Sequence, residues 1–166
     1  MKSTIAFASA FLASLVAAAP APTPTPTPTP APAPAPAQAA GQTVSVSWDA
    51  AYDVGTSSLA TVTCSDGPYG LLPRGFTDFA SLPIFPNIGG APTIADGNSP
   101  NCGKCYELHY SFGNTDKTIN VIGIDSAPSG FNIGLQAMNA LTNGQAERLG
   151  RIDATYVQVD DSVCGM

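Results

Sequence analysis

The sequence predicts a mainly β protein, a small closed β-barrel with one or two short helices. Three observations lead to this fold class: several short segments alternate between apolar and polar residues, one segment has helical spacing, and Gly and Pro recur between the segments. Many short strands joined by such turns are typical of a barrel or of a two-sheet sandwich. The sandwich is the structural alternative.

Two segments alternate in the way that half-buried strands do. Every second residue is apolar over residues 44–48 and again over residues 106–112. The second segment is followed by turn residues at 113–116 and by another apolar segment at 117–124, which together indicate a β-hairpin. Residues 155–159 supply a further strand near the C-terminus.

One segment between these strands predicts a helix. Its apolar residues would share one face: Ile133, Ala137, Ala140 and Leu141. Asn132 is the expected N-cap, and Asn143 with Gly144 is expected to end the helix. This capping role competes with any role of Asn132 in binding a ligand.

The first 41 residues are expected to lie outside the fold. Residues 1–18 have the basic start, apolar core and small-residue cleavage site of a secretory signal peptide. Residues 19–41 form a spacer rich in Pro, Thr and Ala, in which every second residue from Ala19 to Pro36 is Pro. Such a spacer is a semi-rigid linker with O-glycan acceptors at its threonines. Its consecutive X-Pro dipeptides also fit stepwise removal by a protease that releases dipeptides.

The remaining residues, 42–166, form one predicted domain that contains all four cysteines. A secreted domain is expected to join them in two disulfides, and spacing leaves three pairings open. Cys64 pairs with Cys102, with Cys105, or with Cys164, and the other two cysteines pair with each other. The C-x-x-C at 102–105 would suggest thiol redox chemistry in a cytosolic protein, but the secretory context argues against it.

Charge and histidine content exclude several classes of function. The chain has 6 basic and 12 acidic residues, and the net charge of the predicted domain is −7. The sequence therefore predicts no basic surface that would bind nucleic acid or anionic membranes. It also disfavours acidic polymers as ligands. The single histidine, His109, excludes sites that need two imidazoles and is expected on the polar face of its strand. The ligand class that remains open is uncharged molecules.

The candidate site follows the apolar segment that ends at Ile124. Asp125 begins a turn-rich stretch, residues 126–132, and loops on a rigid sheet commonly carry binding groups. A carboxylate there can accept hydrogen bonds from sugar hydroxyls, or act as a general acid if its pKa is raised. It can equally accept backbone N–H bonds that shape its own loop.

Catalysis has weaker support than binding. Glycoside hydrolysis generally needs two carboxyl groups about 5 to 9.5 Å apart. None of the available partners has a diagnostic spacing to Asp125: Asp49, Asp53, Asp66 and Asp78. Serine-type catalysis has still less support, because the sequence lacks the G-x-S-x-G motif.

Aromatic residues near turns are candidates for contact with sugars, because their ring faces fit the C–H groups of a pyranose. Trp48, Tyr52 and Tyr69 have such positions. Alternation directs Trp48 inward, which favours core packing, whereas Tyr52 lies beyond the strand and is the better candidate.

Short motifs occur in order along the domain: VSVSWD at 44–49, CSDG at 64–67, FPNIGG at 85–90, SPNCGKC at 99–105, IDS at 124–126, GFN at 130–132, GRID at 150–153 and YVQVD at 156–160. Together with the four cysteines, these motifs resemble the cerato-platanin family of small secreted fungal proteins. The resemblance covers Thr43 to Gly165. Trp48 stands where Tyr is commoner in the family, and the Pro-Thr spacer is not a usual family feature.

The resemblance implies a six-stranded double-psi β-barrel related to the first domain of expansins and to barwin-like proteins. It also implies that Cys64 pairs with Cys102 and that Cys105 pairs with Cys164. Family members are secreted or held in the fungal wall, bind N-acetylglucosamine oligomers of the chitin type in a shallow groove, and loosen polysaccharide networks without appreciable hydrolysis. Many elicit plant defences and self-assemble at interfaces.

The resemblance also bears on individual residues. Asp125 and Asn132 match positions in the family's groove, and Asp125 matches the carboxylate that related endoglucanases use catalytically. The predicted carbohydrate-binding residues are therefore Tyr52, Asp125, Ser126 and Asn132, with no catalytic residue and no metal or other cofactor.

The predicted function is that of a secreted, non-catalytic carbohydrate-binding protein with expansin-like loosening activity, located outside the cell or in the fungal cell wall. Its expected partners are chitin or β-glucan oligosaccharides, a plant cell-surface receptor and further copies of the chain, but neither nucleic acid nor a membrane span. One alternative is a weak glycoside hydrolase with Asp125 as general acid. Another is a surface-active, self-assembling interaction protein.

Overall fold

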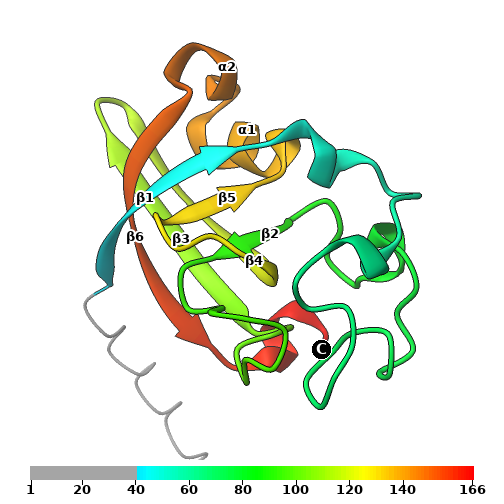
Figure 1. The fold of residues 1–166 in the computed structure, drawn as a ribbon. Coiled ribbons are helices and arrows are strands. Elements are labelled where there is room, and N and C mark those ends of the chain that lie inside the picture. The colour runs from blue at the N-terminus through cyan, green and yellow to red at the C-terminus, as the bar shows by residue number, and fades with distance from the viewer. Residues whose placement is uncertain (1–40) are drawn as a thin grey trace, which may run out of the picture. The chain divides into compact units, whose positions relative to one another are not determined.

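Six strands close into a barrel in the computed structural model, which describes residues 41–166 (Figure 1). They are β1 (Gln42–Trp48), β2 (Ile88–Ala91), β3 (Cys105–Phe112), β4 (Thr115–Ser126), β5 (Phe131–Ile133) and β6 (Arg151–Val159). Their order around the barrel is β1, β5, β2, β4, β3, β6, and β6 pairs back onto β1. The closed barrel expected from the sequence is confirmed, and the sandwich is excluded. The signal peptide and nearly all of the predicted spacer lie outside the described residues.

The alternating segments form strands with the expected sides buried. In β1, Val46 is fully buried and its apolar neighbours at 44 and 48 pack partly against the core. In β3, the apolar side is buried as far as Tyr110, whereas Phe112 is 73% exposed at the end of the strand. The turn to β4 is only Gly113 and Asn114, two residues shorter than predicted, because Thr115 and Asp116 already pair with β3.

β4 is the longest of the six strands and lies between β2 and β3 in the barrel. Its first part pairs antiparallel with β3, and its last part pairs parallel with β2. The register with β2 shifts between Gly89 and Gly90, and such a bulge bends the sheet locally. Residues 121–124 of β4 are fully buried, so the strand delivers Asp125 to the barrel surface from a rigid base.

The helix prediction is partly wrong. α1 (Leu135–Thr142) begins later than expected, since Asn132 and Ile133 belong to β5 and pair with Gly90 and Gly89 of β2. The predicted N-cap role of Asn132 is therefore incorrect. The residue at the N-cap is Gly134, which has no side chain to cap the helix.

A distant carboxylate replaces the missing cap. Asp53 Oδ1 accepts a hydrogen bond from the backbone N–H of Gln136, at 3.2 Å. The predicted apolar face is also corrected, because Ala140 is exposed and Met138 is fully buried. Asn143 takes the left-handed conformation and ends α1 as expected. A short second helix, α2 (Ala146–Leu149), follows.

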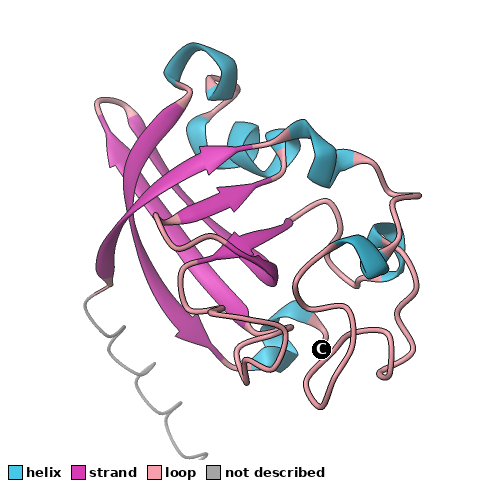
Figure 2. Ribbon diagram, in the orientation of Figure 1, coloured by secondary structure: helices cyan, strands magenta, loops and turns pink. Residues whose placement is uncertain are grey.

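The long connection from β1 to β2 contains three 3₁₀ turns and no strand of the barrel (Figure 2). These are η1 (Ala50–Asp53), η2 (Leu59–Thr61) and η3 (Phe79–Ser81). Each buries one apolar or aromatic side chain, and each begins with a polar side chain that accepts a backbone N–H bond. The connection is thus ordered, and its buried side chains belong to the same hydrophobic core as those of the barrel.

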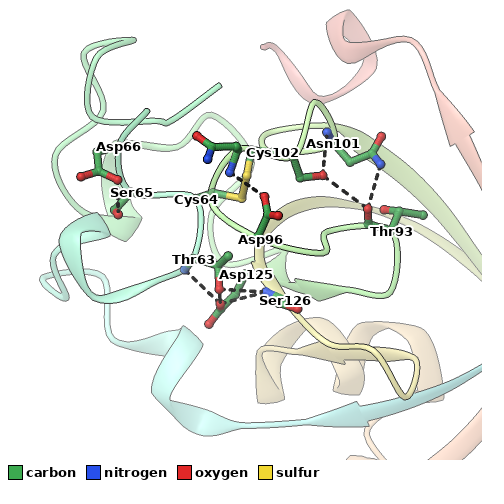
Figure 3. The surroundings of a disulfide bond; sticks show 12 residues. Thr63, Cys64, Ser65, Asp66, Thr93, Asp96, Asn101, Cys102, Asp125 and Ser126 are labelled. Carbon is green, nitrogen blue, oxygen red and sulfur yellow. Dashed lines mark hydrogen bonds between the residues drawn. A yellow bond between two sulfur atoms is a disulfide. The ribbon is translucent and has the colours of Figure 1, made fainter. Parts of the chain in front are cut away.

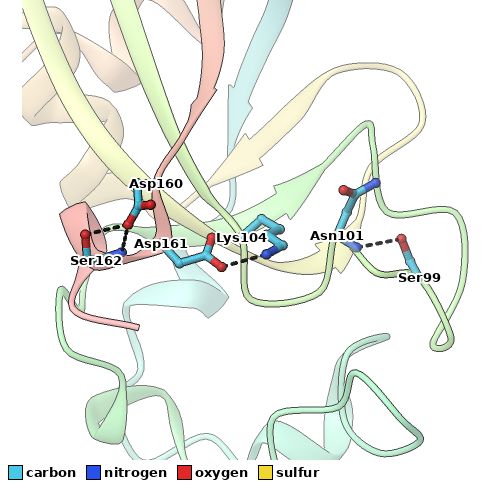
Figure 4. A network of polar contacts seen from close by, with 6 residues as sticks. All are labelled: Ser99, Asn101, Lys104, Asp160, Asp161 and Ser162. Atoms are coloured by element: carbon cyan, nitrogen blue, oxygen red, sulfur yellow. Dashed lines mark hydrogen bonds and ion pairs between the residues drawn. The ribbon is translucent and has the colours of Figure 1, made fainter.

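Two disulfides fasten flanking segments to the start of β3. Cys64 in the long connection pairs with Cys102, and Cys105 pairs with Cys164 in the C-terminal turn η4 (Asp161–Cys164). These are the pairs that the family resemblance implies. Lys104, which precedes Cys105 in the sequence, forms a salt bridge of 2.6 Å with Asp161 of η4 (Figure 4). No helix in the described part of the chain is long and apolar enough to span a membrane.

Candidate functional site

Asp125 lies near the end of β4, and both of its oxygens accept hydrogen bonds. Figure 3 shows those from Thr63 and Ser126. Oδ1 accepts from the backbone N–H of Thr63 at 3.0 Å, from the backbone N–H of Ser126 at 2.8 Å, and from the Thr63 hydroxyl. Oδ2 accepts from the Tyr52 hydroxyl at 3.1 Å. The half-buried carboxylate therefore ties two parts of the long connection, η1 and the backbone at Thr63, to the end of β4.

Tyr52 occupies η1, directly after β1, and is 9% exposed. Its ring packs 6.2 Å from that of Phe79, so its face is covered by protein rather than open for stacking on a sugar. Burial, and next the nearby charge of Asp125, raise the pKa of the Tyr52 hydroxyl well above its usual value. Tyr52 is thus a neutral donor that holds Asp125 in place.

An open hollow of about 460 Å³ lies beside this cluster, along the connection from β4 to β5. We call it the β4–β5 hollow. Its lining residues come from the ends of β1, β4, β5 and β6 and from the loop between β4 and β5: Ser47, Trp48, Ser126, Ala127, Pro128, Ser129, Gly130, Phe131, Asn132 and Arg151. Of the four predicted site residues, Ser126 and Asn132 line the hollow, whereas Tyr52 and Asp125 lie in the adjoining cluster.

Strand pairing explains why residues far apart in sequence meet here. Asp125 pairs with Gly90 on β2, Gly90 pairs with Asn132 on β5, Asn132 pairs with Ser47 on β1, and Ser47 pairs with Arg151 on β6. Neighbouring strands are about 4.8 Å apart, so Asp125 and Asn132 flank Gly90 at a separation of roughly 10 Å. We call these paired residues, from Asp125 through Gly90, Asn132 and Ser47 to Arg151, the polar row. The Asp125 cluster, which is Asp125 with its partners Tyr52 and Thr63, lies at one end of the row, and the hollow adjoins it.

The loop that walls the hollow depends on a close backbone approach. Gly130 has a φ of +133°, and a Cβ at this position would lie 2.1 Å from the carbonyl oxygen of Ser45. A side chain there would push the loop away from β1. Glycine thus lets residues 127–130 rest on the barrel and define the side of the hollow.

Three lining residues have their polar groups fixed by neighbours. The hydroxyl of Ser47 donates to Asn132 Oδ1 at 3.1 Å. The half-buried ring of Trp48 is oriented by a 3.0 Å bond from its Nε1 to the carbonyl oxygen of Ala146. Arg151 Nη1 donates to the hydroxyl of Ser45 at 2.9 Å. The hollow is thus a preorganised surface of one aromatic ring, hydroxyls, an amide and one guanidinium.

The sequence does not indicate that Ser47 or Arg151 lines a site, and it offers Trp48 only as a candidate better suited to core packing. Alternation directs Trp48 inward, but at the end of β1 an inward side chain reaches the rim of the barrel, where its ring is only partly covered. Arg151 has no local signal at all, because its position depends on pairing with Ser47. Of the three aromatic candidates, Trp48 lines the hollow, Tyr52 lies in the Asp125 cluster, and Tyr69 is not among the lining residues.

The carboxylates considered as catalytic partners of Asp125 are engaged elsewhere. Asp49 and Asp78 cap η1 and η3, and Asp53 caps α1. Asp66 is exposed and accepts a bond from the neighbouring Ser65 hydroxyl. No acidic side chain is a hydrogen-bonding partner of Asp125 within residues 41–166.

His109 and Asp116 form an exposed pair on the β3–β4 hairpin, with 2.8 Å between Nε2 and Oδ1. The histidine lies on the polar face of its strand, as predicted, and is remote from the polar row in the strand register. Among residues 41–166, no three His, Cys, Asp or Glu side chains are grouped as metal ligands.

Comparison with known proteins gives consistent matches over the barrel domain. A family model described as Cerato-platanin matches residues 44–166. The heat-stable 19 kDa antigen of Coccidioides immitis is 46% identical over 124 residues, which are 75% of this chain and 82% of that protein.

Solved structures agree with this match. Cerato-platanin 1 from M. perniciosa superposes with a TM-score of 0.71 at 49% identity, covering 73% of this chain and 98% of its own. The solution structure of the fungal elicitor cerato-platanin gives a TM-score of 0.62 at 39% identity, covering 73% and 96%. The double-psi barrel, the two disulfides and the sequence match lead to one conclusion: this chain belongs to the cerato-platanin family.

Proposed function

We propose that this protein is a secreted, non-catalytic carbohydrate-binding protein that holds chitin or β-glucan oligosaccharides in the β4–β5 hollow. The observation that carries the proposal is the grouping of a fixed aromatic ring, hydroxyls and an amide around about 460 Å³ of open space. Ligand sites commonly have about 300 to 1,000 Å³ and combine apolar surface with a few oriented polar groups. Secretion rests on the predicted signal peptide.

The chemistry of the hollow supports sugars as the ligand class. The Trp48 ring offers an apolar face to pyranose C–H groups, while Ser126 and Ser129 carry hydroxyls that donate and accept. The Asn132 amide adds a further polar group between them. Among the described residues 41–166, no carboxylate lines the hollow, which supports recognition of the ligand rather than acid catalysis upon it.

Asp125 and Tyr52 have a positioning role in this proposal. The Asp125 carboxylate fixes the backbone of Ser126, the first residue of the hollow, through a 2.8 Å bond. Tyr52 and Thr63 in turn fix the carboxylate. Replacing Asp125 with Ala is expected to weaken oligosaccharide binding by displacing Ser126, even though both carboxylate oxygens are already bonded within the protein.

The proposal extends to expansin-like loosening of polysaccharides and to elicitation of plant defence. A protein that binds single polysaccharide chains exchanges hydrogen bonds between chains for bonds to itself, and this exchange loosens a network without cleaving it. The similar solution structure is described as that of a fungal elicitor, which supports the second activity. The protein partners that we propose are a plant cell-surface receptor and further copies of the chain.

Titration of the domain with N-acetylglucosamine tetramer, followed residue by residue by NMR, tests the proposal. Perturbed signals are expected for Trp48, Ser126 and Asn132, and Asn132→Ala is expected to weaken binding about fivefold. Asn114→Ala on the exposed β3–β4 turn is the matched control. Shifts confined to other surfaces, or equal affinity of the two variants, would contradict the proposal.

A second assay separates binding from catalysis. Reducing-sugar release from chitin or β-glucan that disappears in Asp125→Asn would support the glycoside hydrolase instead. The proposed function predicts no release of reducing sugar by the unaltered protein or by Asp125→Asn.

Leaf infiltration with Asn132→Ala tests whether elicitation depends on the hollow.

A further inference from the structure

A second hollow, of about 320 Å³, lies between the β3–β4 hairpin and the two helices. The hairpin turn and α2 lie at the same end of the barrel (Figure 1). We call this space the hairpin–helix hollow. It shares no lining residue with the β4–β5 hollow. The lining residues that matter here are Tyr110, Phe112, Gln145, Arg148 and Leu149.

Strand pairing explains why two aromatic side chains reach this hollow. β3 pairs with β6 only as far as His109, whereas its pairing with β4 continues to Phe112. The inward side of β3 therefore extends past the edge of the barrel, and both Tyr110 and Phe112 lie on that side. Their rings are nearly parallel, with 23° between the planes and 6.5 Å between the centroids.

Tyr110 has a buried ring and an unpartnered hydroxyl. The residue is 7% exposed, and within residues 41–166 no hydrogen bond engages its hydroxyl. The hydroxyl is not enclosed by protein either, so it opens into the hollow that Tyr110 lines. Tyrosine hydroxyls at buried positions usually have a partner. This one is therefore available to a ligand at the base of the hollow.

Arg148 supplies a positive charge at the rim. It is exposed on α2, and its Nε donates to Gln145 Oε1 at 2.9 Å, as does its Nη2. Gln145 thus orients the guanidinium and leaves the N–H donors of Nη1 for a ligand. Among the described residues, Arg148 is the only charged group that lines the hollow, and it forms no salt bridge.

These groups define the chemistry of a ligand. Phe112, 73% exposed, and the half-buried Leu149 offer apolar surface to a flat body. Arg148 favours a negative group at the rim, and the Tyr110 hydroxyl favours a polar group at the base. The volume is at the lower end of the range of about 300 to 1,000 Å³ for ligand sites, so the ligand is small.

The charge of the domain limits the ligand to one negative charge. A net charge of −7 repels anions, and polyanions most strongly. At physiological ionic strength this repulsion is screened beyond about 8 Å, so a direct contact with Arg148 decides the binding of a small monoanion.

We propose that the hairpin–helix hollow binds small aromatic carboxylates that carry a hydroxyl at the far end of the ring, such as 4-hydroxycinnamate. The ligand ring lies on Phe112, its carboxylate pairs with Arg148, and its hydroxyl bonds to that of Tyr110. This site is independent of the proposed carbohydrate site, since the two hollows have no residue in common.

NMR titration of the domain near neutral pH, where a carboxylic acid is ionised, tests the proposal with three compounds. 4-Hydroxycinnamate is expected to perturb the signals of Tyr110, Phe112 and Arg148. Its methyl ester, which lacks the charge, is expected to bind about tenfold more weakly. Cinnamate, which lacks the ring hydroxyl, is expected to bind about fivefold more weakly.

Variants assign each contact. Arg148→Gln is expected to weaken binding of 4-hydroxycinnamate about tenfold and to remove the preference over the ester. Tyr110→Phe keeps the ring, and it is expected to remove the preference over cinnamate. Arg151→Gln makes the same charge change as Arg148→Gln in the β4–β5 hollow, and it is expected to leave binding of 4-hydroxycinnamate unchanged. Circular dichroism on each variant verifies that the barrel is folded.

The outcomes separate this inference from the proposed function. Absence of saturable binding, or equal affinity of the unaltered domain for the acid and the ester, would overturn the inference and leave carbohydrate binding intact. A loss in Arg151→Gln rather than in Arg148→Gln would place the ligand in the β4–β5 hollow and would likewise overturn it.

Discussion

At the scale of single residues, Asp125 and Tyr52 are two predicted ligand contacts that bond to each other in the structure. The sequence offered a carboxylate at a strand end and a tyrosine near a turn, each compatible with sugar binding. The structure joins them by a 3.1 Å hydrogen bond and buries the tyrosine ring. Their partnership fixes the first residue of the hollow, Ser126.

The pKa of Tyr52 provides a direct measure of this pair. Burial raises it most, and the Asp125 charge raises it further, so Asp125→Asn is expected to lower the Tyr52 pKa while leaving it above the ordinary 10.0. NMR titration of the tyrosine ring signals measures the change. Asp66→Asn, a charge removed from an exposed site, is the control and is expected to have no effect. An unchanged Tyr52 pKa in Asp125→Asn would contradict the geometry.

The same shift affects stability at alkaline pH. Because the pKa of Tyr52 is higher in the folded chain than in the unfolded chain, folding favours the protonated phenol. The resulting stabilisation is complete below the unfolded value and is lost as the pH rises through the folded value.

At the scale of elements, the loop from β4 to β5 is held against the barrel by Gly130. Gly130→Ala is expected to cost about 2 to 4 kcal/mol of unfolding free energy, because it adds a clash with the Ser45 carbonyl to an unfavourable φ. Gly144→Ala is the matched control, since its φ is +79° and a Cβ there would meet nothing within 4 Å. Urea unfolding of both variants measures the difference. Equal losses of unfolding free energy in the two variants would mean that the close approach of residue 130 to β1 does not contribute to stability.

The start of α1 permits a second comparison at this scale. Asp53→Ala is expected to destabilise the domain by about 1 kcal/mol, the usual cost of a lost helix cap. Asn132→Ala removes the residue that the sequence pattern suggests as the cap and is expected to leave the N–H of Gln136 as protected as before. The rate of amide hydrogen exchange at Gln136, measured in both variants, distinguishes Asp53 from Asn132 as the cap of α1. Faster exchange in Asn132→Ala alone would restore the original helix prediction.

At the scale of the whole molecule, the disulfide between Cys64 and Cys102 links the long β1–β2 connection to the barrel. Replacing both cysteines with Ser is expected to cost about 4 kcal/mol by loop entropy. Because Thr63 adjoins Cys64, the variant is also expected to loosen the Asp125 cluster and to bind sugar more weakly. Thermal unfolding and oligosaccharide titration measure the two effects. An unchanged melting temperature would contradict the first.

Much of the barrel was predictable because its signals are local. Alternation along residues 106–112 states which side chains face inward, and two turn residues suffice to reverse the chain into β4. The helix failed as a prediction at its start, because an apolar residue at 133 fits a helix face and a strand equally well. Pairing of Ile133 with Trp48 and Gly89 decides between them, and neither partner is near in sequence.

The sequence by itself determined the strand alternation, the exclusion of highly basic surfaces and the resemblance to one family, since each follows from residue types at short spacing. Only the tertiary structure decided that Trp48 rather than Tyr52 lines the hollow, and that Arg151 joins Asn132 there. These positions depend on which strands pair and in which register. Register is a property of several segments together, so no single segment encodes it.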